Sequence, residues 1–265
     1  MLGAAAPWHL AALEDAYRLL MAGSFEAAEA RARAVVRARE GVWRRDGWPW
    51  TRWEGRYYAA LAAVDHGRGA SVLAELEGLI AELEHLAGED RLLQLRARTL
   101  RAGVLIDEGR PAEADAEAEA VLRVLTRTMY VTDVWELELD ALVCMGRALC
   151  ALDRHEEAET IARAHLPRAA GYLVNDLHLL LLRSLSGQGR HEEALAEPHR
   201  HSPELFPAYA GAHELATAVA LHGLGRHKEA GEEAQRALTV CERHLHPSHP
   251  RAAATRALLA RIAPA

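Results

Sequence analysis

Gly189-Arg190-His191-Glu192-Glu193-Ala194 is one copy of a six-residue motif that recurs along this chain of 265 residues. A glycine or an equivalent residue comes first, an arginine usually follows, and glutamate and alanine close the motif. Glycine just past a helix favours a left-handed C-terminal cap, and glutamate in a first turn interacts favourably with the helix dipole. The motif therefore predicts the end of one helix, a turn and the start of the next helix.

The motif starts at residues 23, 67, 109, 153, 189 and 225, so successive copies are 44, 42, 44, 36 and 36 residues apart. The copy at 67–72 is degenerate, because Ala70, Ser71 and Val72 replace its acidic residues and alanine. A period of this length is typical of a solenoid, in which each repeat buries its apolar face against its neighbours.

Two further positions recur upstream of the motif. A small residue lies seven positions before five of the six copies, with Leu182 as the exception: Ala16, Ala60, Ala102, Gly146 and Ala218. A leucine lies four positions before five copies: Leu19, Leu105, Leu149, Leu185 and Leu221. This spacing places both on the buried stripe of one helix, where a small side chain allows a close approach of another helix. We predict an all-α solenoid of about six helix-turn-helix hairpins, with a closing helix over 250–262 and no β-structure, as one domain over 1–265.

Proline positions agree with these helices, except in the fifth hairpin. Pro198 interrupts the expected second helix of that hairpin. Because proline lacks an N–H group and restricts the residue before it, we expect a short helix there, followed by an irregular connector over 199–207.

The composition describes an ordinary water-exposed surface. The chain is 50% hydrophobic and 26% charged, and its net charge of -7 disfavours nucleic acid as a partner. There is neither a basic leader nor an apolar run long enough to cross a bilayer, so we expect no membrane association and a cytoplasmic location. The three cysteines, Cys144, Cys150 and Cys241, are odd in number and widely spaced, which is typical of reduced core residues.

The sequence resembles tetratricopeptide repeats in three features: the motif, the small residue seven positions before it and the leucine four positions before it. The longer spacings and the His249-Pro250 segment are similar to the kinesin-light-chain-like subclass, as found in bacterial proteins. The resemblance implies a right-handed superhelix whose first helices line a concave groove. It covers nearly the whole chain, yet it indicates little about function, because such repeats carry many unrelated partners.

Counting back from each motif gives the residues expected in that groove. Positions thirteen and six before the fourth and fifth motifs hold Asp140 with Arg147 and Asp176 with Arg183. Two interpretations remain open: a ladder of ion pairs between helices, such as Arg147 with Asp176, or a polar floor that binds a peptide's backbone or carboxylates through arginine. The other predicted groove residues are Tyr17, Glu54, Tyr57, Arg96 and His222.

The loop over 41–51 raises a separate question, since four of the six tryptophans lie between residues 43 and 53. They either pack onto neighbouring helices or bind a partner together with nearby arginines. A third interpretation, stacking on nucleic acid, is disfavoured by the acidic net charge. The predicted loop site comprises Trp48, Trp50, Arg52 and Trp53, of which we expect Trp53 to be buried because it begins the next helix.

No pattern in the sequence indicates catalysis. There is no glycine-rich phosphate loop and no nucleophile elbow, and His244, His246 and His249 lack further ligands nearby. We expect no enzymatic activity, no metal and no cofactor. The leading hypothesis is a regulatory scaffold or adaptor for a protein or peptide. The alternative is a sensor of a small molecule or signal peptide that binds among Tyr17, Tyr57, Trp53 and the groove arginines. The oligomeric state stays open.

Overall fold

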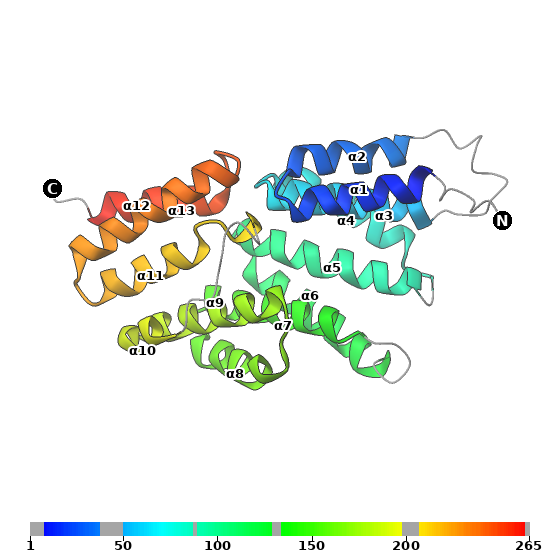
Figure 1. Cartoon of the computed structure of the whole chain (residues 1–265). Coiled ribbons are helices and arrows are strands. Elements are labelled where there is room, and N and C mark those ends of the chain that lie inside the picture. Colours follow the sequence, from blue (N-terminus) through cyan, green and yellow to red (C-terminus); the bar gives the residue numbers. More distant parts are fainter. Residues whose placement is uncertain (1–7, 38–49, 87–88, 129–133, 198–206, 263–265) are drawn as a thin grey trace. The chain divides into compact units, whose positions relative to one another are not determined.

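The structure is a computed structural model that describes residues 8–37, 50–86, 89–128, 134–197 and 207–262. Over these ranges the chain forms thirteen α-helices and two short 3-10 helices, and no strand (Figure 1). The all-helical fold class is therefore confirmed for this part of the chain. None of its helices is both long and apolar enough to span a bilayer.

The chain divides into two compact units, Met1–Ala97 and Arg98–Ala265, with the boundary inside α5. In the first unit α1 packs on α2 and α3, α2 packs on α3, and α3 packs on α4. Its core is built largely from alanine, including Ala12, Ala16, Ala32 and Ala59, all at most 1% exposed. The helices of this unit are α1 (Trp8–Met21), α2 (Phe25–Arg37), α3 (Trp50–Asp65), α4 (Gly69–Glu82) and the start of α5 (Glu89–Asp107).

In the second unit each helix likewise packs on its neighbours in sequence, and its core centres on the leucines of α9. In addition α7 contacts α9, α9 contacts α11, and α11 contacts α13, so the first helices of successive hairpins form a layer. The helices after α5 are α6 (Pro111–Thr128), α7 (Trp135–Ala151), α8 (His155–His165), η2 (Leu166–Arg168), α9 (Tyr172–Gly187), α10 (His191–Ala196), η3 (Pro207–Tyr209), α11 (Ala212–Gly223), α12 (His227–His244) and α13 (Pro250–Ile262).

The six-residue motif ends a helix in all six copies. Its first residue has a positive φ each time, from 59° at Asp153 to 89° at Gly67, and only Asp153 is not glycine. In the fifth copy Gly189 N–H donates to Ser186 at 3.0 Å and Arg190 N–H donates to Leu185 at 2.9 Å, which is the hydrogen-bond pattern of a Schellman cap. The same two bonds occur in the other five copies, which confirms the predicted turns.

The small residues before the motif allow close helix packing, as predicted. Gly146 shows this most directly, because a Cβ atom built on it would lie 2.3 Å from Leu180 Cδ2. The four alanines at this position are at most 1% exposed. Of the leucines four positions before the motif, four are buried and Leu19 is half-buried.

Two specific predictions about helices are also confirmed. The closing helix spans Pro250–Ile262, and α10 is only six residues long, ending before Pro198. Most of the connector expected over 199–207 lies outside the described residues. The superhelical handedness, the assignment to tetratricopeptide repeats and the single domain over 1–265 stay predictions.

Candidate functional site

The polar residues predicted on α7 and α9 lie in the layer of first helices in the second unit. Asp140 and Arg147 come from α7, and Asp176 and Arg183 come from α9, which packs directly against it. All four side chains are half-buried. The structure therefore brings them onto adjacent helices, where their neighbours determine what each can bind.

The two aspartates accept hydrogen bonds from tyrosines of the following hairpin. Tyr172 OH donates to the Asp140 carboxylate at 3.1 Å, and Tyr209 OH donates to Asp176 Oδ2 at 2.5 Å. Burial, followed by the adjacent aspartate, raises the pKa of each tyrosine well above its usual value. Both hydroxyls therefore stay protonated and donate to the carboxylates.

These tyrosines were missed by sequence reasoning. The signal that could have found them is their spacing, since the two tyrosines lie 32 and 33 residues after their aspartates, close to the repeat period. Spacing shows only that two positions recur, whereas the bond depends on where each side chain points.

The ion-pair ladder was wrong in its predicted example. Arg147 does not pair with Asp176; its Nη2 lies 3.2 Å from Asp107 Oδ1, at the end of α5. Asp176 is engaged by Tyr209 instead. Arg147 thus pairs with a carboxylate of the preceding hairpin, Asp107, whereas Asp176 accepts a hydrogen bond from a tyrosine of the following hairpin.

A third arginine joins this region from the closing helix. Arg251 Nη1 donates to the carbonyl oxygens of Ala208 and Ala210, each at 2.9 Å. These two bonds hold the guanidinium in place beside the start of α11. Arg251 lies outside the motif-derived positions, so the repeat pattern could not have identified it. We call Arg147, Arg183 and Arg251 the arginine cluster.

Arg183 differs from the other two arginines, because within the described ranges its guanidinium makes neither a hydrogen bond nor an ion pair. Burial, together with the positive charges of Arg147 and Arg251, lowers its pKa to about 10. A guanidinium normally keeps its proton far more strongly than this. Burial is thus the main cost of this charge, the neighbouring arginines add to it, and Asp107 opposes them. An anion beside Arg183 would offset that cost.

Asp176 lies in the same electrostatic environment. Burial raises the pKa of this carboxyl to about 6, although the Tyr209 hydrogen bond and the three arginines of the cluster oppose that shift. The carboxyl consequently titrates near physiological pH, unlike an exposed aspartate.

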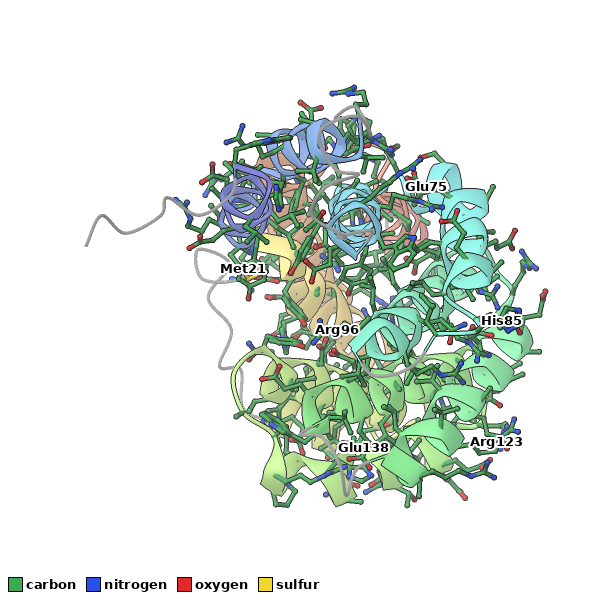
Figure 2. All side chains as sticks on the ribbon, turned by 90° about the vertical axis from the view of Figure 1, so that its right-hand side faces the viewer. Met21, Glu75, His85, Arg96, Arg123 and Glu138 are labelled. Atoms are coloured by element: carbon green, nitrogen blue, oxygen red, sulfur yellow. The ribbon has the colours of Figure 1, made fainter. Side chains whose placement is uncertain are left out.

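In the first unit the predicted residues form an aromatic surface on α1 and α3. Tyr17 is 48% exposed, and its ring lies 6.1 Å from Tyr58, which in turn lies 5.7 Å from Tyr57. Tyr58 was not predicted. Glu54 is half-buried on α3, and Arg96 is exposed on α5 (Figure 2).

The tryptophan loop is described only where it enters α3. Trp48 and the side chain of Trp50 lie outside the described residues, and Arg52 is exposed. The prediction that Trp53 is buried was wrong: it is half-buried, and its Nε1 donates to Glu82 Oε2 at 3.2 Å on α4. Glu82 at the end of α4 thus supplies the hydrogen-bond acceptor that an indole N–H group usually finds in a folded protein.

His222, the last predicted groove residue, is half-buried on α11, and its Nδ1 lies 3.2 Å from Nδ1 of His227. His249 is buried, and its Nδ1 accepts a hydrogen bond from Arg251 N–H at 3.1 Å. Across the described ranges no group of three or more His, Cys, Asp or Glu side chains is arranged to hold a metal ion.

Neither family models nor curated proteins gave a match to this chain.

Proposed function

We propose that this protein is a non-enzymatic interaction module of the tetratricopeptide type, which binds an acidic segment of a protein or peptide at the arginine cluster. The observation that carries the proposal is Arg183, a half-buried guanidinium that has no acceptor among the described residues and feels the positive charges of Arg147 and Arg251. Its cytoplasmic location is part of the same proposal.

The physical reason is the cost of an unsatisfied cation. A partly desolvated guanidinium has lost part of its water and gains no protein acceptor in exchange. A carboxylate supplies two acceptor oxygens in one plane, which match the planar N–H groups of arginine. Binding an acidic side chain or a C-terminal carboxylate would thus restore the missing hydrogen bonds.

A second candidate is a sensor of a small molecule or signal peptide in the first unit. Exposed Tyr17, in contact with Tyr58, favours it, because exposed tyrosines supply both apolar area and a polar group to a ligand. This candidate predicts ligand binding that is lost in Tyr17→Ala and unchanged in Arg183→Gln.

Selection from a library of displayed peptides tests the leading proposal, followed by calorimetry with a selected synthetic peptide. We expect acidic peptides, and we expect Arg183→Gln to weaken their binding by about 2 to 5 kcal/mol, as for a desolvated charge pair. Arg243→Gln is the matched control, because Arg243 is exposed on α12 and has no partner among the described residues.

The melting temperatures of these variants separate binding from structure. Unchanged affinity together with a lowered melting temperature in Arg183→Gln would mean that the arginine is structural, and the proposal would be wrong. Selection of apolar or basic peptides that bind elsewhere would have the same consequence.

A further inference from the structure

The three arginines of the cluster act on Asp176 electrostatically, yet the hydrogen bond to its carboxylate comes from a neutral group. Its carboxylate accepts a hydrogen bond from the Tyr209 hydroxyl at 2.5 Å, whereas Arg147 pairs with Asp107 and Arg251 binds backbone carbonyls. The titratable and charged groups of the elements around Asp176 include Asp107 from α5, Asp140, Cys144 and Arg147 from α7, Tyr172 and Arg183 from α9, Tyr209 from η3 and Arg251 from α13. The negative charge of Asp176 therefore attracts the three arginines without a direct hydrogen bond to any of them within the described residues.

An external anion at Arg183 would meet the negative charge of Asp176. Two like charges in one partly desolvated site disfavour each other, so one of them gives up its charge when a proton is available. The thiol of Cys144 cannot take part, since burial raises its pKa to about 12 and keeps it neutral. The hydroxyls of Tyr172 and Tyr209 are already protonated.

Two further carboxylates lie in this region: Asp107 is held by its ion pair with Arg147, and Asp140 accepts the Tyr172 hydrogen bond. Asp176 lies beside Tyr209, next to the carbonyls that bind Arg251, and burial raises the pKa of its carboxyl. We therefore assign the incoming proton to Asp176.

We propose that the arginine cluster takes up an oxyanion together with one proton, and that the proton comes from solvent and binds the Asp176 carboxylate. The oxyanion makes the hydrogen bonds that Arg183 lacks, and neutral Asp176 no longer competes for the cluster. That the oxyanion is the carboxylate of an acidic peptide rests on the proposed function. The proton-linked oxyanion site itself does not depend on that function.

The titration of Asp176 agrees with this geometry. Because the pKa of its carboxyl is about 6 without a ligand, the carboxyl is mostly ionised at pH 7.5 and mostly protonated at pH 5.5. Binding at pH 7.5 must therefore include protonation, whereas binding at pH 5.5 need not. Affinity is expected to rise as the pH falls.

Calorimetric titration of the full chain with sodium sulfate and with sodium methanesulfonate tests the site. Both probes keep their charge from pH 5.5 to 7.5, and sodium chloride holds the ionic strength constant. We expect affinity to increase on the order of tenfold from pH 7.5 to pH 5.5, as linkage to one proton of this pKa requires. At pH 7.5, titrations in two buffers with different ionisation enthalpies should show close to one proton taken up per anion.

Asp176→Asn tests whether this carboxyl carries the proton linkage. This variant should bind sulfate at pH 7.5 as tightly as the wild type does at pH 5.5, with no further pH dependence. Arg183→Gln should abolish binding and Arg243→Gln should leave it unchanged. If Arg183→Gln does not fold, Arg183→Lys keeps the charge, and it should weaken binding by losing the planar fork of donors.

The outcomes separate this inference from the proposed function. Absence of sulfate binding at every pH, or an Asp176→Asn variant that follows the wild-type pH profile, overturns the proton-linked site. If selected acidic peptides bind equally at both pH values through Arg183, the proposed function stands and the linkage is wrong. If sulfate binds with a proton while no peptide is selected, the linkage stands and the peptide partner is wrong.

Discussion

At the scale of single residues, Asp176 shows two opposing effects on one carboxyl. Burial disfavours its charge, while Tyr209 and the arginine cluster favour it, and the net result is a raised pKa. A buried acid whose pKa is raised prefers to be neutral, so its ionisation lowers the stability of the folded state. The arginines of the cluster thus compensate only part of the cost of this charge.

We expect Asp176→Asn to increase the free energy of unfolding at pH 7.5 by about 1 to 3 kcal/mol. The wild-type carboxyl has a pKa of 3.8 when unfolded and about 6 when folded, so the folded state binds the proton more tightly. Stability from this group is greatest below pH 4 and is lost as the pH rises towards 6. Urea unfolding at pH 4 and pH 7.5 measures the effect, which should vanish at the lower pH. A less stable variant at pH 7.5 would show that attraction to the arginines outweighs burial.

Gly146 gives a prediction about packing. Because a Cβ atom there would lie 2.3 Å from Leu180, Gly146→Ala should lower the free energy of unfolding by about 1 to 3 kcal/mol through overpacking. Gly231→Ala on α12 is the control, since its nearest atom would be 3.6 Å away. That control should be neutral or stabilising by up to about 1 kcal/mol, because alanine favours helix over glycine. Equal effects in chemical denaturation would argue against the close contact of α7 and α9.

At the scale of helices, the turns are determined more by backbone conformation than by ion pairs. Arginine and glutamate pair across four of them, as Arg190 and Glu193 do with Nη2 and Oε2 2.6 Å apart, but these groups are largely exposed. Exposed pairs contribute little to stability. The recurrent element is the residue with positive φ, which only glycine adopts without strain.

We therefore expect the turn that contains Asp153 to be the least stable of the six. Asp153→Gly should increase the free energy of unfolding by about 0.5 to 1 kcal/mol. The reciprocal variant Gly189→Asp should destabilise it by a similar amount at the equivalent position. Thermal unfolding of the two variants checks both signs. A loss of stability in Asp153→Gly would mean that its side chain, whose Oδ1 lies 3.6 Å from His155 Nε2, contributes more than the backbone strain costs.

At the scale of the whole molecule, the described residues form hairpins in which each helix packs mainly on its sequence neighbours. Such chains gain stability from each repeat and from the interfaces between adjacent repeats. The short α10 is the one hairpin element that departs from this regularity within the described ranges, and Pro198 accounts for it.

We expect the far-ultraviolet circular dichroism and the amide I infrared band of the full chain to be those of an all-helical protein. This measurement also covers the residues that the structure does not describe. An infrared component typical of strands would contradict the all-α fold class predicted for the whole chain.

The sequence alone determined the helix ends, the turns, the closing helix and the short α10, because these depend on local properties: positive φ at glycine, the missing N–H group of proline and the period of buried side chains. It also placed Asp140, Arg147, Asp176 and Arg183 on neighbouring helices, because equivalent positions in adjacent repeats lie side by side. Only the tertiary structure decided their partners. Tyr209 reaches Asp176 across 33 residues, and Arg251 enters from the last helix. Burial then sets the pKa of Asp176 and of Arg183, and burial depends on all the helices that surround a side chain rather than on its own sequence neighbours.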